Sequence, residues 1–308
     1  MISGFRIVAA TGIDQGDRDY QQDQLLLTSH PRVKSCVLGV VADGMGGRSG
    51  GRNASDQVLL TAQQLLDRYD PDSDDPCDFL ERIAREAHIV IRLTAVSSEQ
   101  EPHSTMAAFL INPDGTCAFA HSGDSRLYHY RADELLHCSK DHSFVQTLVE
   151  RGELTEEQAL YDTRSNLLMH CLGAESEPVV TRHPIGQLQP GDTILACSDG
   201  LWHYFSPDEL GRVVSQLSPR QACEFLTHKA RQRAEGRGDN LSLIIVKLEP
   251  LFVPPEPPPD SPDNLPTEPT QVSEVSTSRR SWARYLFDCI SLSRETVRGN
   301  SCDKGPSV

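Results

Sequence analysis

Three aspartates stand at the ends of apolar, strand-like runs, each beside a small or turn-forming residue. The runs read VLGVVADGMGG (37–47), DTILACSDG (192–200) and GRGDNLSLIIV (236–246), and the aspartates are Asp43, Asp199 and Asp239. A carboxylate at the end of a buried strand has a fixed place and direction. Several such groups gathered from distant parts of a chain leave negative charge that must be neutralised. Hard divalent cations with oxygen ligands do this, so the pattern predicts a site for two metal ions.

The folded part of the sequence is expected to cover residues 1–249. Two helices with apolar stripes are predicted between the third and fourth strands, one running from Val58 to Tyr69 and one beginning near Pro76. Blocks of strands and helices, rather than alternating units, predict sheets covered by helices. The expected strands are 5–11, 23–28, 36–43, 106–111, 117–123, 126–131, 192–199 and 241–248, and later helices are expected at 143–151, 206–216 and 219–234.

Composition limits the kind of protein this can be. The 308 residues are 38% hydrophobic and 24% charged, which is typical of a globular protein with flexible additions. A net charge of −15 argues against nucleic acid as a ligand. The nine cysteines form no CxxC pair, which indicates reduced thiols. With no signal-peptide pattern and no long apolar window, we expect a cytoplasmic monomer.

The sequence changes character at Pro250. Residues 250–278 are proline-rich and acidic, which predicts a disordered linker. Residues 279–298 have helical apolar spacing with arginines at the start, and 299–308 are expected to form a disordered tail. Such a basic amphipathic helix could bind a partner, fold back on its own domain or lie at the inner membrane surface.

Asp-Gly pairs by themselves indicate only turns. Asp114-Gly115, between two predicted strands, is interpreted as an ordinary hairpin turn. Arg18 and Asp23 precede a strand, where Arg18 suits bidentate recognition of phosphate and Asp23 suits a metal contact. Asp124 lies at a strand-to-strand turn. Taken singly, the segments around Asp23 and Asp124 are equally consistent with solvated turns.

The order of these segments resembles the metal-dependent Ser/Thr protein phosphatases of type 2C, the PPM family, in its bacterial form. The resemblance covers about residues 5–248. It is carried by Arg18 with Asp23, VADGMGG (41–47), HSTMAAFLI (103–111), GDSRLY (123–128), DHSFVQTLVERGELTEEQA (141–159), LACSDGLW (195–202) and GDNLSLIIV (238–246).

The resemblance implies an α+β fold, a four-layer α-β-β-α sandwich with two central, mainly antiparallel sheets. It implies that Asp43 bridges two Mg²⁺ or Mn²⁺ ions and that the Gly44 carbonyl, Asp199 and Asp239 complete the direct ligands. Asp23 would hold metal-bound water, and Asp124 with Asp199 would match a third, weaker ion position. Asn240 would orient the neighbouring turn, and residues 142–190 would include a mobile flap.

The implied reaction is hydrolysis of phospho-Ser/Thr in proteins, opposing a Ser/Thr kinase. Two ions would share a hydroxide that attacks phosphorus in line, without a covalent intermediate, and Arg18 would stabilise the phosphoryl oxygens. Met45 stands where animal relatives have a histidine, and we interpret His121 and His142 as structural. The alternatives are a non-catalytic binding module and a phosphatase for small metabolites.

Overall fold

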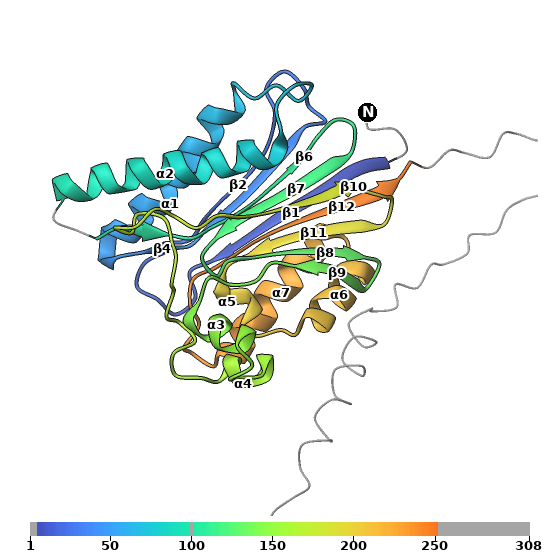
Figure 1. The fold of residues 1–308 in the computed structure, drawn as a ribbon. Coiled ribbons are helices and arrows are strands. Elements are labelled where there is room, and N and C mark those ends of the chain that lie inside the picture. Colours follow the sequence, from blue (N-terminus) through green and yellow to red (C-terminus); the bar gives the residue numbers. More distant parts are fainter. Residues whose placement is uncertain (1–4, 99–100, 252–308) are drawn as a thin grey trace, which may run out of the picture. The chain divides into compact units, whose positions relative to one another are not determined.

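Two five-stranded antiparallel sheets form the centre of the part of the chain that the structure describes. The computed structural model describes residues 5–98 and 101–251 (Figure 1). The strand order in the first sheet is β1 (Phe5–Asp14), β12 (Leu241–Pro250), β11 (Asp192–Cys197), β8 (Arg126–Arg131) and β9 (Glu134–Cys138). In the second it is β10 (Thr181–Gln187), β7 (Thr116–Ser122), β6 (Met106–Ile111), β3 (Val37–Ala42) and β2 (Gln24–Ser29). A short pair joins β4 (Gly44–Met45) to β5 (His103–Ser104).

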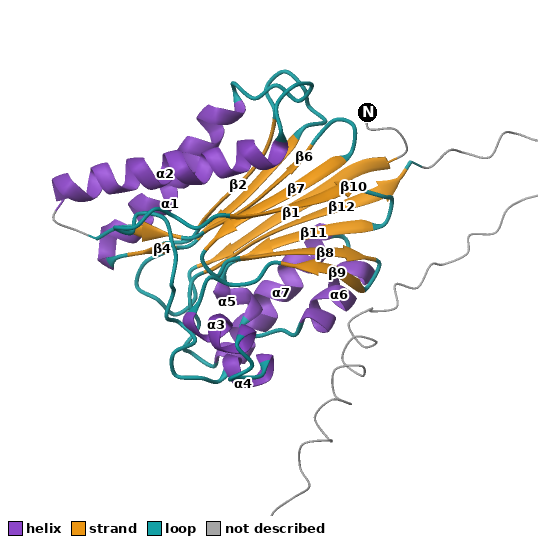
Figure 2. Cartoon of the chain, viewed as in Figure 1, coloured by secondary structure: helices purple, strands orange, loops and turns teal. Residues whose placement is uncertain are grey.

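Helices cover the outer face of each sheet (Figure 2). The second sheet carries α1 (Gly47–Leu66) and α2 (Pro76–Ser98), and the first carries α5 (Asp199–Trp202), α6 (Pro207–Gln216) and α7 (Pro219–Ala234). Two short helices, α3 (Phe144–Glu150) and α4 (Glu156–Leu160), lie in the segment between β9 and β10. The predicted four-layer α-β-β-α sandwich is confirmed.

The central strands are apolar throughout because both of their faces are buried. In β3, Leu38 and Val40 pack toward the helices, whereas Val37 and Val41 pack between the two sheets. The inter-sheet layer is completed by large side chains of both sheets, among them Phe109, Phe119, Leu127, Ile194, Ile244 and Val246. Because both faces of these strands are apolar, their apolar runs identified them in the sequence but did not show which face each residue occupies.

Three local features were not predicted. Helix α1 begins at Gly47, well before the apolar stripe that starts at Val58. Edge strand β10, at 181–187, was missed. Edge strand β9 was also missed. Both strands are partly exposed and lack an apolar run, and β10 contains Pro184 next to a register shift, so their sequences carry little strand signal.

The predicted linker, amphipathic helix and tail fall outside the described residues, apart from Pro250, which is the last residue of β12, and Leu251. Among the helices in the described part of the chain, none has the length and apolar character needed to cross a bilayer.

We predict that Gly39→Ala is destabilising. A Cβ at Gly39 would lie 2.2 Å from Cζ of Phe109, its cross-strand partner in β6, so the added methyl group overpacks the inter-sheet layer. The expected loss is about 1–3 kcal/mol in the free energy of unfolding, measured by urea denaturation. Phe109→Leu is the matched partner change. Phe109→Leu should lower the free energy of unfolding less in the Gly39→Ala background than in the wild-type chain. Additive effects of the two changes would contradict this explanation.

Candidate active site

Five aspartates from distant parts of the sequence meet at one end of the sandwich. We call Asp23, Asp43, Asp124, Asp199 and Asp239 the carboxylate cluster. Each lies next to a strand end. In the order just given, they lie before β2, after β3, between β7 and β8, after β11 and before β12. Burial and then repulsion from the other four raise the pKa of Asp43 well above its ordinary value, so all five share one electrostatic environment. The structure therefore brings together every carboxylate predicted to bind metal.

Asp23 is the fully buried member. Its Oδ2 accepts a 2.6 Å hydrogen bond from Ser198 Oγ, and that hydroxyl also accepts a hydrogen bond from the backbone N–H of Ser242. Its Oδ1 has no hydrogen-bond partner. Burial raises the pKa of Asp23 to about 6, although the hydrogen bond from Ser198 opposes the shift. A buried carboxylate oxygen without a donor is an available ligand for a cation or for water bound to one.

Asp43 is held through its backbone. Its N–H donates to Thr105 Oγ1 at 3.0 Å, and its carbonyl accepts from the Thr105 N–H at 2.9 Å. Thr105 Oγ1 is also 2.7 Å from Ser125 Oγ, next to Asp124. Sequence reasoning gave Thr105 no individual role. Its only signal was the run of small hydroxyl residues that opens the 103–111 segment.

Gly44 follows Asp43 where the backbone of α1 approaches closely. A Cβ at Gly44 would lie 2.0 Å from the carbonyl oxygen of Gly51 and 2.8 Å from that of Gln22, so no side chain fits. Packing against the amino-terminal end of α1 therefore requires glycine at position 44. Space for a metal ion at its carbonyl would be a second, separate reason.

Asn240 ties the Arg18 segment to the start of β12. Its Oδ1 accepts from the Gln22 N–H at 2.7 Å, and its Nδ2 donates to the carbonyls of Gln15 and Tyr20 at 2.8 and 2.9 Å. The prediction that Asn240 orients this turn agrees with these contacts. Arg18 Nη2 lies 2.6 Å from Asp239 Oδ2, so the predicted phosphate-binding arginine sits directly at the cluster.

Burial raises the pKa of Asp199 well above its ordinary value, and repulsion from Asp124 is the largest charge effect that adds to this shift. Burial raises the pKa of Asp124 to about 7, with a further increase from Asp141. Asp199 is the first residue of α5, so the chain leaves β11 and turns immediately into a helix.

The donor set fits hard divalent cations in chemical type. The cluster offers carboxylate oxygens, and among the described residues only Asp239 has an arginine partner. Asp199 has only a distant histidine, with Oδ2 3.9 Å from His203 Nδ1. In the described ranges, however, no three His, Cys, Asp or Glu side chains form a ready-made metal-binding group. Because like charges repel and Arg18 contacts Asp239, the side chains must move together when a cation binds.

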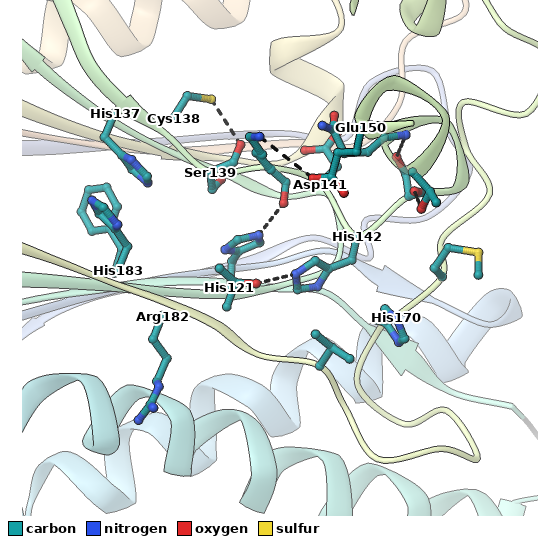
Figure 3. Close-up of a pocket in the computed structure, with 18 residues that line it drawn as sticks. His121, His137, Cys138, Ser139, Asp141, His142, Glu150, His170, Arg182 and His183 are labelled. Atoms are coloured by element: carbon teal, nitrogen blue, oxygen red, sulfur yellow. Dashed lines mark hydrogen bonds and ion pairs between the residues drawn. The ribbon is translucent and has the colours of Figure 1, made fainter. Parts of the chain in front are cut away.

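A groove that none of the five aspartates lines lies between the edge strands β9 and β10 and helix α3 (Figure 3). Its volume is about 560 Å³, and its lining includes His121, His137, His142, His170 and His183. His121 Nε2 bonds the Lys140 carbonyl, and His142 bonds the Gly123 N–H through Nδ1 and the Thr181 hydroxyl through Nε2. His121 and His142 thus have the structural contacts expected of them.

Imidazoles of the groove stack on one another. The His137 and His183 rings are parallel, with centroids 3.7 Å apart, and connect the two sheet edges. Burial, with the neighbouring imidazoles, lowers the pKa of His137 to about 4 and that of His142 to about 3. Neither His137 nor His142 is therefore suited to donate a proton at neutral pH.

Comparisons with known proteins agree with this arrangement. The family model described as "Protein phosphatase 2C" matches residues 15–234. The chain belongs to the protein phosphatase 2C family. It is 36% identical over 167 residues to the serine/threonine protein phosphatase PstP of Mycobacterium tuberculosis, covering 52% of this chain but only 31% of that protein. It is 28% identical over 224 residues to the serine/threonine phosphatase stp of Listeria innocua, covering 68% of this chain and 83% of the relative.

Solved structures give the same result for the fold. A crystal structure of M. tuberculosis PstP has a TM-score of 0.69 and 29% identity, and the match covers 79% of this chain and 99% of that one. The catalytic domain of PstP in complex with two manganese ions has a TM-score of 0.68 and 27% identity, and the match covers 80% and 100%. The family predicted from the motif order is confirmed.

We predict that Mn²⁺ or Mg²⁺ stabilises the protein more at neutral than at acid pH. Because the pKa values of Asp23 and Asp124 are raised, the contribution of these two groups to metal-free stability is fully present below their ordinary value of 3.8 and is lost as the pH rises through about 6 to 7. A cation relieves that loss, whereas protons compete with it. The ion is used at one fixed concentration, about 100 times its Kd at pH 7.5. It should then raise the Tm by roughly 5–10 °C near pH 7.5 and by much less near pH 5.

Differential scanning fluorimetry with and without the ion measures this effect. The groove histidines contribute to stability with the opposite pH dependence. Comparing the Tm with and without the ion at each pH cancels that contribution. Asp114→Asn, in the turn between β6 and β7, is the control and should keep the full increase in Tm. An equal increase at both pH values would contradict the role assigned to the cluster.

Proposed function

We propose that this chain is a metal-dependent protein serine/threonine phosphatase. The observation that carries the proposal is the meeting of five carboxylates at one end of a protein phosphatase 2C fold, with an oxygen of buried Asp23 left without a partner. No side chain other than those of the carboxylate cluster is proposed as a ligand. Mg²⁺ or Mn²⁺ is the proposed cofactor, as two ions with a third position at Asp124 and Asp199.

Each member of the site has a proposed role. Asp43, Asp199, Asp239 and the Gly44 carbonyl would hold the ions directly, Asp23 would act through water, and Asp124 would share the third position. When bound, the ions would supply the Lewis acidity that activates water and neutralises phosphate charge. Thr105 fixes the backbone of Asp43, while Asn240 and Ser198 fix the segments that carry Asp239 and Asp23.

Arg18 is proposed to bind the phosphoryl oxygens of the substrate. Its guanidinium is largely exposed on one side and contacts Asp239 on the other, so it reaches from the cluster toward solvent. A planar guanidinium can donate two hydrogen bonds to a phosphate while keeping its charge. Arg18 would therefore orient the phosphate for in-line attack by water, without a covalent intermediate.

The substrates are proposed to be phosphoproteins, with a Ser/Thr kinase as the opposing activity. The relatives named serine/threonine phosphatases support this class of substrate. We also propose a cytoplasmic monomer in which residues 1–249 form the catalytic unit, 250–278 a linker and 299–308 a tail. The basic segment 279–298 would dock on a protein or at the inner membrane surface.

Asp43→Asn and Asp239→Asn should each abolish turnover. Each change removes one carboxylate charge from the cluster at nearly constant shape, so kcat should fall by about 10²–10³-fold or more. Release of phosphate from a phospho-Thr peptide in Mn²⁺ measures this loss, and circular dichroism checks the fold. Asp114→Asn, with the same chemical change in a remote turn, should keep the wild-type rate. Near-normal rates in either cluster variant would refute the site.

Changing Arg18 separates phosphate binding from metal binding. We expect Arg18→Lys to lower kcat/KM about tenfold, and Arg18→Ala to lower it further, because the bidentate donors are lost. Mn²⁺ affinity measured by calorimetry should be unchanged or tighter, because Asp239 loses a competing cation. Arg164→Ala is the control, because Arg164 is also an exposed arginine that pairs with an aspartate, Asp162. Weaker Mn²⁺ binding in Arg18→Ala would contradict the assigned role.

A further inference from the structure

Trp202 connects two members of the carboxylate cluster. It is buried in α5, in the single helical turn that begins with Asp199. Its indole Nε1–H donates to the backbone carbonyl of Asp124 at 2.9 Å. The two connections that carry Asp124 and Asp199 are thus joined by one side-chain hydrogen bond. A shift of the indole would change the separation of the two carboxylates.

The Trp202 ring packs against two neighbouring side chains. The guanidinium carbon of Arg126 lies 3.6 Å from its ring centroid, and the His203 ring stacks on it at 4.3 Å with 18° between the planes. Arg126 in turn makes a bidentate pair with Asp141, both contacts being 2.8 Å. Stacking and the bidentate pair together leave the indole little freedom to rotate.

The same assembly reaches the segment that precedes α3. Asp141 is followed by His142, whose backbone N–H donates to the carbonyl of Gly123 and whose Nδ1 accepts from the Gly123 N–H. Gly123 adjoins Asp124, has a φ of +105°, and packs so tightly that a Cβ there would lie 2.7 Å from Thr105 Cγ2. The Asp124 turn is therefore held by Trp202 and by the 141–142 segment.

We propose that Trp202, packed against Arg126 and His203, is a positioning residue that fixes the separation of the Asp124 and Asp199 carboxylates. It thereby sets the affinity of the divalent ion that these two groups share. The inference rests on the proposed function, because it requires that both carboxylates bind metal. Trp202 itself binds no ion and touches no substrate. Its contribution is one hydrogen bond and the rigidity of the stack.

Mn²⁺ binding to the full chain tests the proposal without relying on activity. Electron paramagnetic resonance of free Mn²⁺ gives the number and affinity of the sites in the wild type and in Trp202→Phe, which keeps an aromatic ring but lacks the N–H donor. In Trp202→Phe we expect the weakest class of sites to lose about fivefold in Mn²⁺ affinity, as for the loss of one hydrogen bond. The Mn²⁺ affinity of the tighter sites should change less than about twofold.

Tyr130→Phe is the matched control. Tyr130 is also buried and donates one hydrogen bond to a backbone carbonyl, that of Pro207 at 2.9 Å, away from the carboxylate cluster. This variant should bind Mn²⁺ as the wild type does. His203→Ala is a second test that preserves the indole and removes the imidazole that stacks on it.

The outcomes separate the inference from the proposed function. Wild-type binding curves for Trp202→Phe would overturn the positioning role while leaving the phosphatase proposal intact. If Trp202→Phe does not fold, wild-type binding by His203→Ala overturns the role instead. Absence of Mn²⁺ binding by the wild type would overturn the proposed function, and the inference with it. Selective weakening in Trp202→Phe, together with normal binding in Tyr130→Phe, would support it.

Discussion

Repulsion among buried carboxylates is the constraint around which this structure is organised. Asp23 and Asp124 are buried and the other three members are half-buried. Burial, together with repulsion within the cluster, raises the pKa of Asp43 and of Asp199. A fold that keeps such groups together without a counter-ion is less stable than one without them. Such a loss of stability is typical of functional sites, and a bound cation would offset it. The unpartnered oxygen of Asp23 is the observation that best supports a cation site here.

The cluster depends on hydrogen bonds between segments that are far apart in sequence. Ser198 reaches Asp23, Thr105 holds Asp43 and Asn240 holds the segment before β2. These donors and acceptors lie outside the regular sheets, yet the two sheets decide where they stand. The inter-sheet layer of large apolar side chains, with Gly39 making room for Phe109, keeps the strand ends at fixed positions. Rigid sheets therefore give precise positions to residues on loops.

Sequence reasoning reached the site because the chemistry is concentrated in short motifs. An aspartate at the end of an apolar strand is visible without any structure, and so is an Asp-Gly turn such as that of Asp114. The partly exposed strands β9 and β10 gave no such signal, and the first turn of α1 was hidden by its glycines. Propensity is a weak guide where tertiary contacts decide the conformation, as they do at Gly44 under the backbone of α1.

The sequence alone determined the family and the buried apolar strands and predicted the five aspartates that the structure brings together, because these depend on residue type and local spacing. Only the tertiary structure decided what surrounds them. It placed Arg18 against Asp239, Thr105 beneath Asp43 and Trp202 beside Asp124. Such contacts join residues whose separation in the chain ranges from tens to hundreds of positions, so no local pattern encodes them. They follow from how the two sheets pack and where that packing leaves the strand ends.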